Sequence, residues 1–186
     1  IFGKANVVHK NWTDLSAAKG RYGIEDKMLI ICNDIDGDFV REPQALKTLT
    51  SCEPQSVKKL YQNEYTVVFR GKIISSGNSI PRVNDTSNGW QRRLVIIPFN
   101  GRFADNPDTT LGDRLSCEAA VEYIIAMAVI YLPKVLKEGF IMPKSVKQML
   151  EEYRVENNPV LEFVQEYGDS FAGRENGKIL DTIYST

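Results

Sequence analysis

The sequence contains few of the residues from which proteins build disulfide frameworks and metal clusters. Only three of its 186 residues are cysteines (Cys32, Cys52 and Cys117), and only one, His9, is a histidine. Three cysteines far apart in the chain favour a reducing cytoplasmic location and argue against both a disulfide framework and a zinc site. One histidine cannot supply a metal cluster either.

The chain also lacks an excess of charge of either sign and a long apolar run. Its formal net charge is -1, so any contact with nucleic acid must come from a local patch. The longest apolar stretch, residues 123–132, is broken by Pro133 and falls short of the roughly 20 residues that a membrane helix needs. It predicts a core helix and no membrane partner.

A phosphate-binding loop is a third absence. Gly3-Lys4 is followed by no Ser or Thr that could reach Mg²⁺, and no glycine-rich run precedes it. Because the chain begins at Ile1, within an apparently structured pattern, we expect it to be a fragment of a longer protein.

The most informative feature that is present is the apolar run at residues 28–32, which ends in Asn33, Asp34 and Asp36. Such a run predicts a strand of a parallel sheet, buried on both faces. Acidic residues after it would lie at the carboxyl end of the strand, where open α/β sheets bind ligands. The alternative interpretation is a polar turn, since Asn, Asp and Gly are ordinary turn residues.

Further strands are predicted at residues 65–69, 73–77 and 94–97, and either a strand or the tail of a helix at residues 1–8. Helical spacing is found at residues 13–19, 42–50 (with Leu46 and Leu49 inward), 56–61, 143–156 and 160–167. Residues 115–137 predict one long helix or two, closed by Gly139, with an apolar face toward the core. Short strands separated by helices and loops favour an α/β architecture.

Three apolar strands of this pattern carry distinctive polar neighbours: Asp34, Asn78 and the pair Arg92-Arg93. A carboxylate that binds metal, an amide that contacts water or phosphate, and an arginine that offsets developing charge suit phosphoryl transfer. Taken singly, Asn78 is also a common turn residue and the arginines also suit a solvated edge. Their combination in this order favours the catalytic interpretation.

These residues belong to longer motifs. They are Leu29-Ile30-Ile31-Cys32-Asn33-Asp34, Ala45-Leu46-Lys47-Thr48-Leu49-Thr50, Ser76-Gly77-Asn78-Ser79-Ile80-Pro81 and Trp90-Gln91-Arg92-Arg93-Leu94-Val95-Ile96-Ile97-Pro98-Phe99. The block from residue 27 to residue 103 resembles the helicase core of phage and plasmid primase-helicases, a branch of superfamily 3 within the AAA+ ATPases. The resemblance extends more weakly over about four-fifths of the chain.

The resemblance implies a role for each matching residue. Asp34 resembles the Walker B acid that holds Mg²⁺, with Asp36 as a second candidate ligand, and Asn78 resembles the polar sensor. Arg92 or Arg93 resembles the arginine finger that reaches a neighbouring subunit's nucleotide. Lys47 matches a lysine of an additional motif at the ATP site. Asn33 departs from the family, which usually has paired acids there.

Residues 58–72 resemble the hairpin with which this family grips single-stranded DNA in a central channel. Lys58, Lys59, Arg70 and Lys72 alternate there with aromatic residues. Cations can follow phosphates and aromatic rings can stack on bases. The alternative is a strand with its usual aromatic residues and a charged flank.

The resemblance implies an incomplete AAA+ core of three layers with a mostly parallel sheet at residues 1–103. A helical subregion at 104–156 and the start of a helical or winged-helix appendage at 157–186 would follow. The phosphate-binding loop would lie upstream of Ile1, so this fragment alone should not hydrolyse ATP.

The longer protein would be an ATP- and Mg²⁺-dependent helicase for replication of a phage, plasmid or integrated element, in the cytoplasm of a bacterium or phage-infected host. It would act as a homo-hexameric ring on single-stranded or forked DNA, with an upstream primase domain as a further candidate partner. The alternatives are a non-catalytic module that binds single-stranded DNA and a kinase-like or other α/β enzyme.

Overall fold

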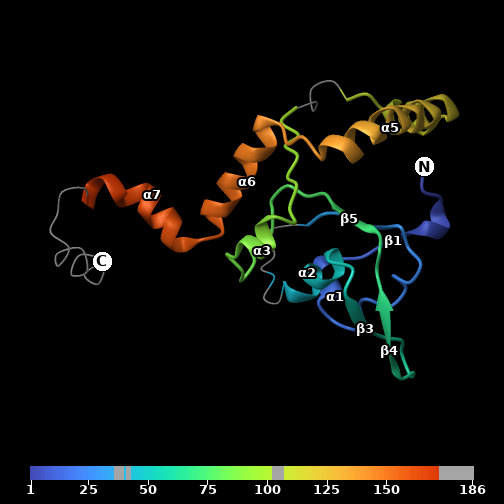
Figure 1. Ribbon diagram of the computed structural model, residues 1–186, viewed down its shortest axis with the longest axis horizontal. Coiled ribbons are helices and arrows are strands. Elements are labelled where there is room, and N and C mark those ends of the chain that lie inside the picture. Colours follow the sequence, from blue (N-terminus) through green and yellow to red (C-terminus); the bar gives the residue numbers. More distant parts are fainter. Residues whose placement is uncertain (36–39, 41–42, 102–106, 172–186) are drawn as a thin grey trace.

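A computed structural model describes residues 1–35, 40, 43–101 and 107–171 of the chain. At its centre is a three-stranded parallel sheet made of β1 (Val7–His9), β2 (Leu29–Cys32) and β5 (Lys72–Ser75), in the order β1-β2-β5 (Figure 1). A short 3₁₀ helix, η1 (Lys4–Asn6), precedes β1. The described residues therefore form a mixed α/β fold with a small parallel sheet, which agrees with the α/β class that the sequence favours.

Strand β2 is the central strand of this sheet, as its apolar run predicts. Ile30 pairs with Val8 on one side and with Ile73 on the other. Leu29, Ile30 and Cys32 are buried, since a strand flanked by strands and covered on its faces has little contact with water.

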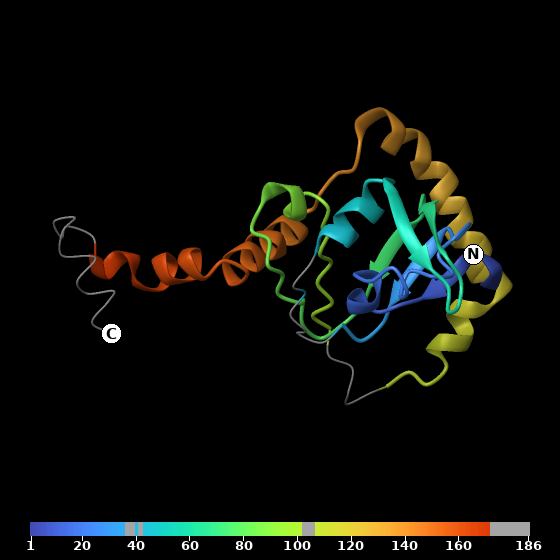
Figure 2. The ribbon, with the colours of Figure 1, turned by 90° about the horizontal axis from the view of Figure 1, so that it is seen from below.

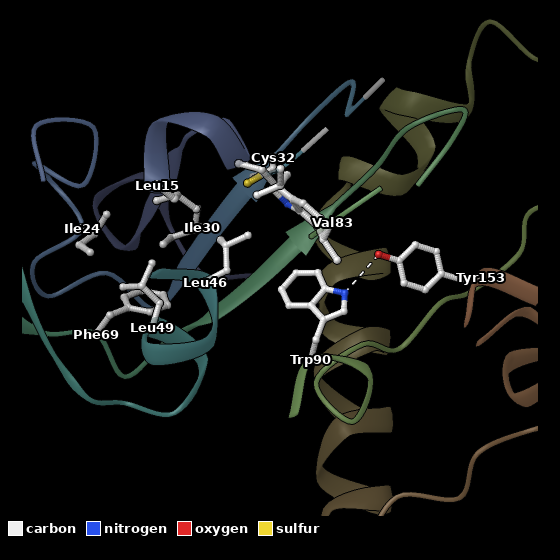
Figure 3. Packing of buried hydrophobic residues seen from close by; sticks show 12 residues of the cluster. Leu15, Ile24, Ile30, Cys32, Leu46, Leu49, Phe69, Val83, Trp90 and Tyr153 are labelled. Carbon is white, nitrogen blue, oxygen red and sulfur yellow. Dashed lines mark hydrogen bonds between the residues drawn. The ribbon is translucent and has the colours of Figure 1, made fainter. Parts of the chain in front are cut away.

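The hydrophobic core lies between this sheet, helix α1 (Trp12–Leu15) and helix α2 (Gln44–Thr50). Figure 3 shows Leu15, Ile30, Leu46, Leu49 and Phe69 pointing into one cluster. Leu46 and Leu49 face inward as predicted. Helix α1 begins earlier and is shorter than the predicted helix at residues 13–19.

The prediction of a helix at residues 56–61 is wrong. These residues belong instead to an antiparallel hairpin of β3 (Pro54–Lys58) and β4 (Glu64–Val68), and β4 confirms the strand predicted at residues 65–69. Within β3 only Val57 is buried, opposite Tyr65 of β4. The short run therefore follows the two-residue period of a strand that turns one side chain inward.

The prediction of a strand at residues 94–97 is also wrong. These residues follow α3 (Asn88–Gln91) and form no strand in the part of the chain that the structure describes. Val95 and Ile97 are exposed. An apolar extended run becomes a strand only when a neighbour accepts and donates its backbone hydrogen bonds, and no described strand pairs with this one.

Residues 111–138 form two helices, α4 (Leu111–Ser116) and α5 (Glu118–Glu138), and Gly139 ends α5 with a φ of 76°. The predicted inward face of α5 is wrong, because this helix, described over its whole length, buries no side chain. It is also long and apolar enough to cross a membrane by length and composition, with a mean hydropathy of 1.7 over its apolar window. This corrects the expectation that no segment reaches that length, although core helices of soluble proteins pass the same test.

The chain continues through α6 (Lys144–Glu156) and α7 (Pro159–Phe171). Helix α6 is amphipathic as predicted, with Val146 and Tyr153 buried. Figure 2 shows α6 and α7 running outward from the α/β body, on the side opposite α5. The last predicted helix, at residues 160–167, lies within α7.

Candidate functional site

The structure brings the ends of β2 and β5 together, and with them two of the predicted site residues. The Ile35 backbone N–H donates a hydrogen bond to the Ser76 carbonyl at 3.0 Å, and the Ser76 N–H donates to the Cys32 carbonyl at 2.9 Å. Asp34 directly precedes Ile35, and Asn78 follows Ser76 by two residues. Both therefore lie at the carboxyl edge of the parallel sheet, where α/β proteins bind ligands.

Gly77 permits this close approach of the two strand ends. A Cβ atom at this position would lie 2.1 Å from the Ile35 carbonyl oxygen, a distance that no side chain tolerates. The glycine thus fixes how near the segment carrying Asp34 comes to the segment carrying Asn78.

Asp34 itself is exposed and has a φ of 51°, in the left-handed region. Asp is one of the few residues that adopt this conformation readily. A cavity of about 120 Å³ adjoins it, bounded by the strand ends and the start of α1 (Asn11, Trp12, Thr13, Asn33, Asp34, Ile35, Val40 and Pro81). Asp36, the second candidate ligand, lies outside the described residues.

Asn78 is also exposed, and it faces a second cavity of about 390 Å³. The far wall of this cavity is the carboxyl-terminal half of α6 and the residue after it, namely Met149, Tyr153, Glu156 and Asn157. Helix α6 therefore shapes the surroundings of Asn78, which the sequence pattern does not predict.

At this edge, Asp34 is the carboxylate that the described residues make available for a divalent cation. Among the described residues, no group of three or more His, Cys, Asp or Glu side chains could hold a metal ion by itself. A magnesium ion bound with a nucleotide needs only one or two carboxylates, because phosphate oxygens and waters complete its coordination. Within the part of the chain that the structure describes, Asp34 thus fits a magnesium–nucleotide complex and does not belong to an all-protein metal site.

Lys47 forms an ion pair with Asp85, with 2.8 Å between Nζ and Oδ2. The Asp85 carboxylate also accepts a hydrogen bond from the Ser87 backbone N–H at 2.8 Å. Burial alone would raise the pKa of Asp85, but the hydrogen bonds from Lys47 and Ser87 outweigh it and hold this pKa below its ordinary value. The charge of Lys47 is therefore already neutralised within the chain.

The two predicted finger candidates differ sharply in their surroundings. The Arg93 guanidinium donates one hydrogen bond to the Gly89 carbonyl and another, of 2.5 Å, to Ser51 Oγ. Arg92 is exposed, and its side chain makes no hydrogen bond or ion pair with any described residue. Arg93 is thus held within its own chain, while Arg92 can reach outward.

Four residues to which the sequence pattern assigns no role in the site connect these segments. Trp90, buried at 3% exposure, packs edge-to-face on Trp12 with 5.9 Å between ring centroids. Its indole Nε1–H donates to the Tyr153 hydroxyl at 3.1 Å (Figure 3). Asn157 accepts a hydrogen bond from the Val83 N–H at 2.8 Å. Trp90 belongs to the motif at residues 90–99, and helical spacing places Tyr153 on the apolar face of the predicted helix at residues 143–156.

The predicted DNA-binding cations lie away from the carboxyl edge of the sheet, with Lys58 and Lys59 in the β3–β4 hairpin and Arg70 and Lys72 near the start of β5. Arg70 and Lys72 stand just before and at the start of β5, so the length of this strand separates them from Asn78. Lys58 lies 4.0 Å from Glu64 across the hairpin, and the Lys59 ammonium lies 5.6 Å from the centre of the Tyr22 ring. All four cations are exposed.

A buried arginine fixes this hairpin to the body of the fold. Arg21 is 7% exposed, donates to the Leu15 carbonyl at 2.8 Å and reaches the Ser56 carbonyl of β3 at 3.0 Å. Burial lowers the pKa of its guanidinium. An ordinary-looking charge in a loop gives no sequence signal of such a role.

Comparison with known families gives one match. Residues 1–93, half of the chain, match a family described as a family of unknown function (DUF5906). No curated protein matches the chain. The matched range contains every strand of the structure and ends at Arg93.

Proposed function

The chain belongs to the DUF5906 family, and from that premise we propose that it is part of an ATP-hydrolysing motor that moves on DNA. The proposal follows the resemblance to the superfamily 3 branch of the AAA+ helicases. The observation that carries it is the placement of Asp34 and Asn78 at adjoining carboxyl ends of two hydrogen-bonded parallel strands. A metal-binding acid beside a polar residue at that edge suits cleavage of a phosphoanhydride bond.

In the proposed site Asp34 would hold the magnesium ion that neutralises charge on the phosphates. Asn78, on the neighbouring strand end, would hydrogen-bond the attacking water or the terminal phosphate. Lys47, which Asp85 neutralises, would hold the segment before α3 in place rather than contact phosphate.

For the arginine finger the geometry favours Arg92 over Arg93. A finger must leave its own subunit and stabilise charge on a nucleotide bound by its neighbour. Arg93 would have to break its bonds to Ser51 and Gly89, whereas Arg92 is exposed. We therefore assign the finger to Arg92 and the local fixing role to Arg93.

The free edge of the sheet supports the proposal that the ATP site is completed by residues outside this chain. β5 is an edge strand, and no described strand pairs with its outer side. The apolar side chain of Ile74 in β5 is 54% exposed. An uncovered apolar edge of this kind accepts a further strand. The phosphate-binding loop would arrive with such an additional strand.

Replacement of Asp34 tests the proposal in the full-length natural protein. We expect Asp34→Asn to lower ATP turnover by about 10³-fold, because a neutral amide holds magnesium weakly. Asp113→Asn in α4, an exposed acid of the same type, is the matched control and should keep wild-type turnover. ATP turnover that is equal in the wild-type, Asp34→Asn and Asp113→Asn proteins would refute the proposed site.

The exposed cations of the hairpin favour a second candidate, a module that binds single-stranded DNA without hydrolysis. The two functions differ in how ATP affects DNA affinity. In a motor, ATP should change the affinity of the full-length protein for a single-stranded oligonucleotide, and Asp34→Asn should alter this response. In a simple binding module, affinity should depend on Lys59 and Arg70 and stay the same with and without ATP.

A further inference from the structure

The end of α6 and the residue after it contact both of the segments that carry the proposed sensor and finger. The Tyr153 hydroxyl accepts a hydrogen bond from Trp90 Nε1–H at 3.1 Å and donates one to the Pro81 carbonyl at 3.2 Å. One helical turn later, Asn157 accepts from the Val83 N–H at 2.8 Å and donates to the Asp85 carbonyl at 3.3 Å.

The contacted residues are close in sequence to the proposed catalytic groups. Pro81 is three residues after Asn78, and Trp90 is two residues before Arg92. Asn78 also shares the cavity of about 390 Å³ with Tyr153 and Asn157. A shift of α6 would therefore move both segments.

The two side chains that make these contacts are buried. Tyr153 is 3% exposed and Asn157 is 8% exposed. Loss of the Tyr153 hydroxyl would leave the Trp90 indole N–H and the Pro81 carbonyl without this partner, and a buried polar group without a partner is costly. The same phenol ring would still fill its place in the core, so its hydroxyl can be tested separately from its packing.

We propose that Tyr153 and Asn157 are positioning residues that couple α6 to the sensor Asn78 and the finger Arg92. This inference rests on the proposed ATPase function. Figure 2 shows α6 leading directly into α7, which projects from the body. A neighbour that pulls or pushes on α7 would thereby change the geometry of both groups at once. The two groups serve different nucleotides, since the finger acts on a neighbouring subunit, so α6 would link successive ATP sites.

Tyr153→Phe in the full-length protein tests the coupling, with Tyr131→Phe on exposed α5 as the matched loss of a hydroxyl. We expect Tyr153→Phe to lower kcat about tenfold, the effect of one lost positioning hydrogen bond. KM and the number of ATP-analogue sites per chain should not change, because the binding groups remain. A variant that only unfolds would lose ATP-analogue binding sites to the same extent as it loses ATPase activity. Tyr131→Phe should behave as wild type.

Hydrogen exchange gives a readout that needs no catalysis. In Tyr153→Phe the Trp90 indole N–H should exchange about tenfold faster, and in Asn157→Ala the Val83 amide should do so, as each loses its acceptor. Unchanged kcat in Tyr153→Phe beside an active wild type would overturn the coupling and leave the proposed ATPase standing. Unchanged exchange in both variants would overturn it as well. A wild type without ATPase activity would remove the proposed function and this inference together.

Discussion

The ammonium nitrogen of Lys47 lies 2.8 Å from a carboxylate oxygen of Asp85, and this ion pair joins helix α2 to the segment that leads into α3. The side chains are 22% and 14% exposed, so water screens the pair only in part. The Asp85 carboxylate also accepts a hydrogen bond from the Ser87 backbone N–H, and its backbone carbonyl accepts one from the Asn157 side-chain amide. The pair thus stands where α2, α3 and the end of α6 meet.

The lowered pKa of Asp85 predicts a pH-dependent contribution to stability. Because the folded-state pKa lies below the unfolded value, the contribution is fully present above about pH 4 and is lost as the pH falls through the folded-state pKa. Asp85→Asn should therefore lower the free energy of unfolding by about 1 kcal/mol at pH 7. The gap from wild type should close toward pH 2, as measured by urea denaturation. A gap of equal size at pH 7 and pH 2 would show that the charge of Asp85 does not stabilise the fold.

The close approach at Gly77 predicts a large effect of one methyl group. Gly77→Ala should lower the free energy of unfolding by about 3 kcal/mol, because its Cβ would collide with the Ile35 carbonyl. Gly112→Ala is the matched control, since a Cβ there meets no atom within 4 Å and alanine favours the helix α4 by about 0.5–1 kcal/mol. Denaturation curves measure both variants. Equal stability of the two would contradict the strand-end geometry.

The different surroundings of Arg92 and Arg93 predict opposite phenotypes. Arg93→Ala should lower the free energy of unfolding by about 1–3 kcal/mol, because it removes the contacts with Ser51 and Gly89. Arg92→Ala should leave the melting temperature unchanged and reduce ATP turnover of the assembled full-length protein by about 10³-fold. If Arg92→Ala keeps full turnover, it is not the finger. If Arg93→Ala keeps the wild-type melting temperature, Arg93 does not stabilise the fold.

The burial of Cys32 predicts unequal thiol reactivity. Burial in the core raises the pKa of Cys32 to about 11, whereas Cys52 and Cys117 are exposed. Thiolates react and thiols do not, so iodoacetamide at pH 8 should modify Cys52 and Cys117 within minutes and Cys32 only after unfolding. Mass spectrometry of the three cysteine peptides would show this order. Rapid labelling of Cys32 in the native protein would contradict its position in the centre of the sheet.

Much of the local structure could be predicted because local patterns dictate it. The run at residues 28–32 has the length and composition of a buried strand, and β2 occupies that place. Leu46 and Leu49 are spaced for one face of a helix, and both are buried in α2. Gly139 ends α5 because a left-handed residue suits a helix terminus.

The errors arise where a neighbour far away in the chain decides the structure. Residues 56–61 are too short for periodicity to separate helix from strand, and pairing with residues 64–68 decides for a strand. Residues 94–97 have the composition of a strand but no described strand beside them. Helix α5 has a core-like sequence, yet none of its side chains is buried within the described chain.

The candidate site likewise has some features that local sequence predicts and others that depend on distant contacts. Local sequence patterns alone identify the groups present: an acid after one apolar strand, an amide after another, two arginines after Trp90 and basic residues around the hairpin. The pairing of β2 with β5, which brings Asp34 and Asn78 to one edge, depends on the folded chain. The tertiary structure also decides that Arg93 is bound while Arg92 is free to reach outward, and that Tyr153 and Asn157 hold both segments. Composition and local pattern fix the chemistry and local conformation of a residue, but its partners depend on contacts between distant parts of the chain that form only when the chain folds.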